Sequence, residues 1–82
     1  MFRILTEDKN REAIYAILDA RIDGYTITPS IGAWKGQREN SLAIDLIGYT
    51  SYTAEIIAAE IKAANAQESV LVLDLTAQAK FI

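Results

Sequence analysis

Hydrophobic and polar positions alternate with a period of two in four stretches of the chain and follow a helical period in two others. The period of two occurs in residues 2–5, 25–34, 42–47 and 70–75. The helical period runs between Thr6 and Gly24, and from Thr50 or Ser51 to about Asn65. Because strands repeat every two residues and helices about every 3.6, the pattern predicts four strands and two helices in the order βαββαβ.

Each predicted helix carries an apolar stripe that can face a core. The stripes consist of Ile14, Ile17, Leu18 and Ile22 in the first helix, and of Ala54, Ile57, Ala58, Ile61 and Ala64 in the second. Thr6 is the predicted N-cap of the first helix, since Glu7 and Asp8 behind it suit a first helical turn. Gly24 is predicted to follow the end of that helix in the left-handed conformation.

Residues 24–46 contain the only Pro and the only Trp of the chain. A proline cannot donate a ladder hydrogen bond, so Pro29 indicates that residues 25–34 form an edge strand. Residues 36–40 are predicted to be the turn into the strand at 42–47, and residues 76–82 an extended tail. With right-handed crossovers, the chain is predicted to be one α+β domain, residues 1–82, with a ferredoxin-like βαββαβ fold, an antiparallel sheet of order 4-1-3-2 and two helices on one face.

The sheet face away from the helices is predicted to be partly apolar. The residues expected there are Arg3, Leu5, Ala43, Asp45, Ile47, Val70, Val72 and Asp74, while Leu71, Leu73 and Leu75 are expected to face the helices. Arg3 is predicted to lie between Asp45 and Asp74 in a cross-strand ionic ladder. The alternative, that the two carboxylates form an acid and base pair, is disfavoured because Arg3 would keep both ionised. An uncovered apolar face indicates a subunit interface.

Composition excludes several functional classes. With no Cys and no His, the chain lacks a thiolate nucleophile, an imidazole base and the usual zinc ligands, so we expect no catalysis, no metal and no cofactor. A net charge of −3 argues against binding of a nucleic acid polymer. Without a long apolar run or a signal-peptide pattern, we expect a cytoplasmic protein that does not enter a membrane. A hydrophobic content of 51% favours a homo-oligomer.

The candidate ligand-binding residues surround the predicted turn. Trp34 offers a platform on which a base can stack, Lys35 and Arg38 offer cations for phosphates, and Gln37 offers an amide. Two secondary candidates lie outside this segment, Tyr25 and Tyr49. The alternative is that Trp34 packs against a neighbouring subunit and that the two cations are solvated turn residues.

Several motifs between the first helix and the third strand occur together. They are Gly24, Tyr25-Thr-Ile-Thr, Gly32, Trp34, Lys35-Gly36 and Leu42-Ala-Ile-Asp-Leu-Ile. In this combination the chain resembles the PII signalling proteins and their PII-like relatives. The resemblance implies a compact trimer whose sheets face inward and which binds small nucleotides in clefts between subunits. Two segments depart from the family: its long T-loop is shortened to residues 36–40, and its phosphate loop is replaced by Asn65-Ala-Gln-Glu-Ser69.

Residues 32–42 are also similar to segments of small uncharacterised phage and prophage proteins. The leading expectation is therefore a non-catalytic homo-oligomer, with a trimer favoured, that binds a small anionic molecule such as a nucleotide between subunits. In a phage it would be an anti-defence sponge that sequesters a nucleotide immune signal. The alternative is a protein interaction module that uses the 25–34 edge or the uncovered sheet face to inhibit or regulate a host or phage protein.

Overall fold

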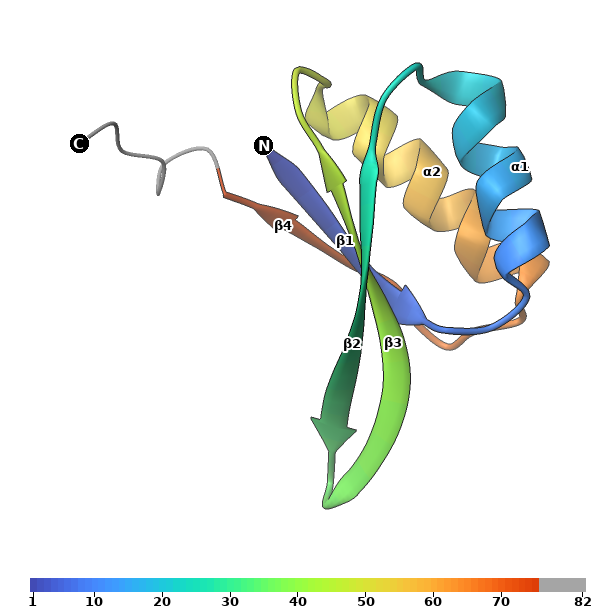
Figure 1. The fold of residues 1–82 in the computed structure, drawn as a ribbon, viewed down its shortest axis with the longest axis vertical. Coiled ribbons are helices and arrows are strands. Elements are labelled where there is room, and N and C mark those ends of the chain that lie inside the picture. The colour runs from blue at the N-terminus through green and yellow to red at the C-terminus, as the bar shows by residue number, and fades with distance from the viewer. Residues whose placement is uncertain (76–82) are drawn as a thin grey trace.

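Two helices pack on one face of a four-stranded antiparallel sheet in the computed structural model, which describes residues 1–75 (Figure 1). The elements are β1 (Phe2–Glu7), α1 (Arg11–Arg21), β2 (Thr26–Trp34), β3 (Gln37–Leu46), α2 (Ser51–Ala64) and β4 (Leu71–Asp74). The sheet order β2-β3-β1-β4 is the predicted order read in reverse. The predicted α+β class and strand order are therefore confirmed, and the topology is compatible with a ferredoxin-like fold. The predicted extended tail lies outside the described residues.

The core forms where one face of β1 and β3 meets the helices. Ile4 pairs with Ile44, and Phe2 with Leu46, so their side chains share one face of the sheet. The residues buried in this core are Ile4, Ile14, Leu18, Ile22, Leu42, Ile44, Leu46, Ala54, Ile57, Ala58 and Ile61. Both predicted helical stripes supply this core, except that Ala64 at the end of α2 is exposed.

The first strand is longer, and the first helix starts later, than the sequence pattern predicts. Thr6 and Glu7 still pair with β3, opposite Leu42 and Ser41. Thr6 is therefore not a helix cap: its buried hydroxyl hydrogen-bonds with the side chain of Gln67. The residue before α1 is Asn10, which has a left-handed φ of 53° and no side-chain cap hydrogen bond. The prediction was wrong because pairing with β3 outweighs the local preference for helix at Glu7 and Asp8.

The helix ends also test two predictions. The chain leaves α1 at Ile22, whose backbone is extended and whose N–H donates to the Leu18 carbonyl. The left-handed conformation predicted for Gly24 is wrong, because the glycines with positive φ are Gly36 and Gly48. The predicted start of the second helix at Thr50 or Ser51 is confirmed, since Thr50 is its N-cap and the Thr50 Oγ1 accepts a hydrogen bond of 3.3 Å from the Thr53 N–H.

The side chains of β4 face the opposite way from the prediction. Val72 pairs with Ile4 and packs against the core, whereas Leu71 pairs with Leu5 on the uncovered face and is 53% exposed. Leu73, not Asp74, is the residue of β4 opposite Arg3. Apart from Asp74, residues 70–75 are apolar on both faces. Their pattern therefore does not specify which face turns inward, and a shift of one residue exchanges the two faces.

Pro29 lies in β2, which is an edge strand as predicted. The β2–β3 hairpin extends past the end of β1, because the β1–β3 ladder stops at Ser41 while β2 and β3 remain paired to Trp34 and Gln37. Figure 1 shows this part of the hairpin projecting below the helices. We call residues 31–40 the arm. It meets the rest of the protein where the Asp8 N–H donates to the Asn40 carbonyl at 3.0 Å.

Candidate functional site

A two-residue turn ends the arm. Trp34 pairs with Gln37, which leaves Lys35 and Gly36 as the turn residues, with φ values of 49° and 78°. Two successive positive φ values are typical of a type I′ turn, whose twist suits a β-hairpin. The predicted turn at residues 36–40 is therefore wrong, since all of these residues except Gly36 belong to β3. Their polar character reflects exposure on both faces of the arm.

The arm exposes the two largest apolar side chains that it contains. Ile31 is 72% exposed and Trp34 is 71% exposed. Because cross-strand partners share a face, Trp34 and Gln37 project on the same side as Arg3 and Asp45, away from the helices. Ile31 projects on the other side. The arm therefore carries an apolar residue on each face and adds none to the buried core.

Three of the four tip candidates predicted from sequence, Trp34, Lys35 and Gln37, lie together, whereas Arg38 projects from the other face of the arm. Lys35 Nζ lies 5.9 Å from the centroid of the Trp34 ring, within the range of a cation–π contact. Gln37 is the cross-strand partner of Trp34 and Arg38 is the partner of Ala33. Neither Lys35 nor Arg38 forms an ion pair with another residue in the range 1–75. The tip thus combines an aromatic ring with two cations whose charge is not neutralised by a bonded carboxylate.

The other two candidates, Tyr25 and Tyr49, lie at the opposite end of β2. Tyr25 donates a hydrogen bond of 2.6 Å to Asp19 Oδ1, and this bond raises the pKa of Tyr25 to about 12, so the phenol stays protonated. The Tyr49 hydroxyl accepts from the N–H groups of Asp23 and Gly24, at 3.0 and 3.4 Å. At roughly 3.3 Å per residue, the length of β2 places these tyrosines about 30 Å from the tip. The six candidates therefore do not form one site within a single chain.

Between the two tyrosines lies a hollow of about 210 Å³. The residues that line it are Gly24, Tyr25, Thr26, Asp45, Ile47 and Tyr49. Hydrogen bonds hold both aromatic walls in place, and Ile47 at the rim is 73% exposed. We call this feature the tyrosine hollow.

Asp45 borders the tyrosine hollow and is paired with Arg3 across the β1–β3 ladder. Arg3 Nε and Nη2 donate to the two carboxylate oxygens at 2.7 and 3.2 Å. The hydrogen bond and the charge of Asp45 raise the pKa of the guanidinium further. This half of the predicted ionic ladder is confirmed, whereas Asp74 lies opposite Phe2. A carboxylate held by a bidentate arginine is poorly suited to proton transfer, which disfavours the alternative in which Asp45 and Asp74 form an acid and base pair.

A second hollow, of about 300 Å³, lies between the end of α1 and the start of α2 and was not anticipated from sequence. Its lining includes Arg21 and the exposed Tyr52. Arg21 is already paired with Glu60 and does not offer a free cation to a ligand. Because this hollow depends on how two distant helix ends meet, no local sequence signal identifies it.

Sequence reasoning missed Ile31 as an exposed apolar position, whereas Ile47, which was expected on the uncovered face, is 73% exposed. Ile31 follows the alternation of β2, and only the early end of β1 shows that it lies beyond the core. The sequence signal available for this exposure was that Ile31 lies shortly before the Lys35-Gly36 turn and opposite the polar residue Asn40.

Within the described part of the chain, no three His, Cys, Asp or Glu side chains gather as a group able to hold a metal ion. In the same residues, neither helix has the length and apolar character needed to cross a membrane. Comparison of the sequence with protein-family models and with curated proteins gave no match. The functional argument therefore depends on the geometry and chemistry of the arm and the tyrosine hollow.

Proposed function

We propose that this protein is a non-catalytic interaction module and that the arm is its binding element, which docks on a protein surface. The observation that supports the proposal is the 71% exposure of Trp34 at the end of a hairpin that adds nothing to the buried core. Tryptophan and arginine are the side chains that most often anchor protein interfaces, and Arg38 lies on the same tip. An exposed tryptophan on a projecting hairpin gains its stabilisation when a partner removes it from water.

The experiment compares Trp34→Ala with Tyr52→Ala in affinity purification from cells that produce the protein. Tyr52 is a matched control, because it is 72% exposed and lies on α2, outside the arm. We expect the wild-type protein and Tyr52→Ala to retain the same stoichiometric partner, and Trp34→Ala to lose it. Retention of that partner by Trp34→Ala would exclude the arm as the binding element.

A second candidate function is binding of a small anionic ligand, such as a nucleotide, between subunits of a homo-oligomer. The observation in its favour is the position of Lys35 beside the Trp34 ring, together with Arg38 on the same tip. An aromatic face can stack on a base while the cations meet phosphates. The PII-like motifs add a trimer as the expected assembly and, in a phage, sequestration of a nucleotide immune signal as the expected role.

Calorimetry against a nucleotide panel that includes cyclic dinucleotides tests this candidate. Lys35→Asn is the informative variant, because asparagine tolerates a positive φ and removes the charge without opposing the turn. We expect heat of binding from at least one nucleotide and a weaker affinity in Lys35→Asn. Absence of heat from every nucleotide, with the assembly intact, would exclude nucleotide binding and leave the interaction module unaffected.

A further inference from the structure

The outer edge of β2 is open along the arm. Among the strands of residues 1–75, β2 pairs with β3 alone. Trp34 and Gln37 flank the two-residue turn, so they exchange both backbone hydrogen bonds, and every second pair along this antiparallel ladder does the same. The residues of β2 between those pairs direct their N–H and C=O groups away from β3. In the arm these residues are Ile31 and Ala33.

Pro29 lies at the same kind of outward position, next to the arm. It is the partner of Leu42, two residues before Ile31, so its missing N–H takes no hydrogen bond from the ladder with β3. Edge strands are commonly protected from pairing by proline or by charged side chains. Residues 30–34 contain neither. The edge is therefore protected beside the core and open along the arm, where two donors and two acceptors are available to another strand.

Gly32 lies between the two outward residues and has no side chain to shield the edge. Apart from its neighbours in the chain, a Cβ built here would come near only Ser41 Oγ among the described residues, at 3.8 Å, which is ordinary van der Waals contact. The packing of the arm therefore does not require glycine, although glycine weakens the interior of a strand. A glycine in a strand is typical of a site where another backbone approaches closely.

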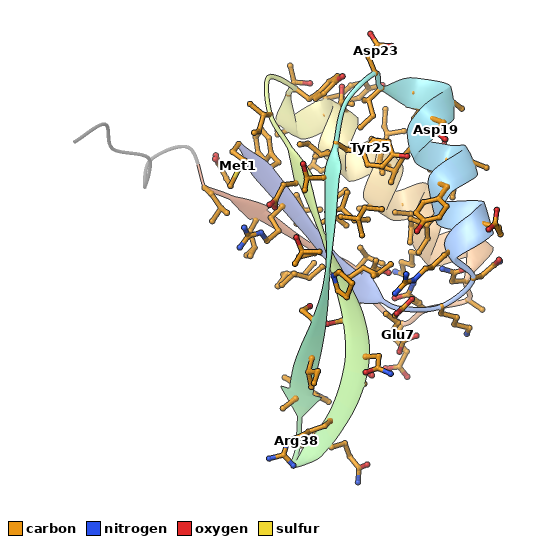
Figure 2. All side chains as sticks on the ribbon, in the orientation of Figure 1. Met1, Glu7, Asp19, Asp23, Tyr25 and Arg38 are labelled. Carbon is orange, nitrogen blue, oxygen red and sulfur yellow. The ribbon has the colours of Figure 1, made fainter. Side chains whose placement is uncertain are left out.

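The small residues at the edge also uncover two charged side chains of β3. Ala33 pairs with Arg38 on one face of the arm, and Gly32 pairs with Glu39 on the other. Neither charge is in an ion pair with another residue in the range 1–75, and Figure 2 shows Arg38 at the far end of the arm from Asp23. A strand added beside β2 would lie about 9.5 Å from β3. With only a methyl group or a hydrogen atom between them, both charges can reach across β2 to that strand.

We propose that the partner of the arm is an extended segment of another protein, which adds to the outer edge of β2 as a further strand and hydrogen-bonds to Ile31 and Ala33. This inference depends on the proposed function of the arm and names the form and chemistry of its partner. An antiparallel orientation continues the pattern of the sheet. The backbone bonds supply affinity, and the side chains on the two faces supply specificity.

The strand pairing specifies the side chains of the partner segment. Its residue opposite Ala33 is acidic and meets Arg38, and its next residue, opposite Gly32, is basic and meets Glu39. The residue after that lies opposite Ile31, which is 72% exposed, and is apolar. In an antiparallel strand the motif is therefore acidic, basic, apolar, in the direction of the C-terminus.

The edge of β2 from a second copy of this chain does not fit these requirements. Residues 26–34 contain no charged side chain. Pairing of two such edges would leave Arg38 and Glu39 of both copies without a partner from the added strand. The charges of the arm therefore favour a segment of a different protein.

A displayed library of random peptides, with about eight random positions to match the length of a strand, tests the proposal on the immobilised protein. Ala33→Pro is the informative variant, because it removes an outward N–H and leaves the ladder with β3 in place, as Pro29 does. Ala33→Ser is the matched control, since it keeps both the N–H and a small side chain. Far-UV circular dichroism checks that both variants are folded.

We expect the peptides enriched on the wild-type protein to share the motif. Synthetic copies should bind Ala33→Pro about tenfold more weakly than wild type, for the loss of one hydrogen bond, and Ala33→Ser as tightly as wild type. In Arg38→Glu, the residue preferred opposite Ala33 should change from acidic to basic.

Hydrogen exchange of single amides gives a direct readout of strand addition. In the free protein, the amides of Ile31 and Ala33 should exchange faster than those of Gly32 and Trp34, which bond to β3. A bound peptide should slow the exchange of Ile31 and Ala33 in particular.

Three results would overturn the proposal: no enrichment on wild type relative to Ala33→Pro, equal affinity of Ala33→Pro and Ala33→Ser, or a bound peptide that leaves the Ile31 and Ala33 amides unprotected. A wild-type dimer that Ala33→Pro dissociates would assign the edge to a second copy and also overturn it. The proposed function can stand when this inference fails. A captured partner that is lost on Trp34→Ala and retained by Ala33→Pro would leave an arm that docks through its side chains.

Discussion

Replacing Gln67 by alanine tests how strongly a buried polar contact ties β1 to the segment between α2 and β4. Gln67 is 9% exposed, and its Nε2 donates to Thr6 Oγ1 at 2.8 Å. Its Oε1 accepts from the Thr6 hydroxyl at 3.1 Å and from the Glu7 N–H at 3.2 Å. Alanine removes all three hydrogen bonds between residues about sixty positions apart in sequence.

The expected loss follows from the groups that remain after the change. Thr6 is 4% exposed, so water cannot easily replace the Gln67 amide, and the hydroxyl keeps only a long contact of 3.4 Å to the Glu7 carbonyl. Leaving a buried polar group unsatisfied costs about 1 to 3 kcal/mol. With the Glu7 N–H only partly buried, we expect the free energy of unfolding to fall by about 2 to 3 kcal/mol. For a domain of this size that corresponds to roughly 8 to 24 °C in the melting temperature.

Urea denaturation followed by far-UV circular dichroism is the appropriate assay, because the exposed Trp34 reports little on the core. Thr6→Val is the matched control, since it keeps the shape of the side chain and removes the hydroxyl. In the Thr6→Val background, Gln67→Ala should cost about 1 kcal/mol less than in the wild type. A Gln67→Ala variant within about 0.5 kcal/mol of wild type, or strictly additive losses, would refute the reasoning.

Three further predictions concern the core, the turn and an ion pair. Leu18→Ala, at a site with no exposed surface, should lower the free energy of unfolding by about 2 to 5 kcal/mol in urea; a loss below about 1 kcal/mol would contradict its place in the core. Gly36→Ala should destabilise the protein by about 1 kcal/mol or more, because Gly36 has a φ of 78° that alanine disfavours. Lys35→Asn should leave the stability unchanged, because asparagine tolerates a positive φ. Equal losses from the two variants would argue against the type I′ turn. Arg21 lowers the pKa of Glu60 below its ordinary value of 4.5. The pair therefore stabilises the fold above that pH, and the stabilisation is lost as the pH falls through the lower folded-state pKa. The melting temperature of Glu60→Gln should vary less than that of the wild type with pH between about 5 and 3, and an unchanged pH profile would count against the pair.

Alternation and one proline were sufficient to predict the order of elements and of strands. Pro29 is informative because only an edge strand or a bulge tolerates the missing donor. The start of the first helix was not predictable from local signals, because Glu7 and Asp8 suit a helix turn while Glu7 pairs with Ser41 in the sheet. The facing of β4 was not predictable either, since Leu71 and Val72 are both apolar and only the register against β1 distinguishes them.

The chemistry of the candidate site was visible in the sequence, but its arrangement was not. Trp34, Lys35 and Arg38 are close in sequence, so the tip follows from local order. Tyr25 and Tyr49 line the same hollow because β2 starts beside the end of β3, as the antiparallel pairing implies. The separation of the two groups depends on the length of the hairpin past β1. That length was hidden because polar residues that are exposed on both faces of a strand look like a loop.

The arm also sets the reach of the molecule independently of its core. Because β1 does not pair beyond Ser41, and the Asp8 N–H contacts only the base of the arm at Asn40, residues can be added to the two strands of the arm without disturbing the packed layers. One added residue in each strand would lengthen the arm by about 3.3 Å and turn Trp34 to the opposite face. Two in each strand would lengthen it by twice as much and restore the face. Adding residues in pairs would therefore change the reach of the arm and keep the face on which Trp34 lies, whereas adding single residues would change both.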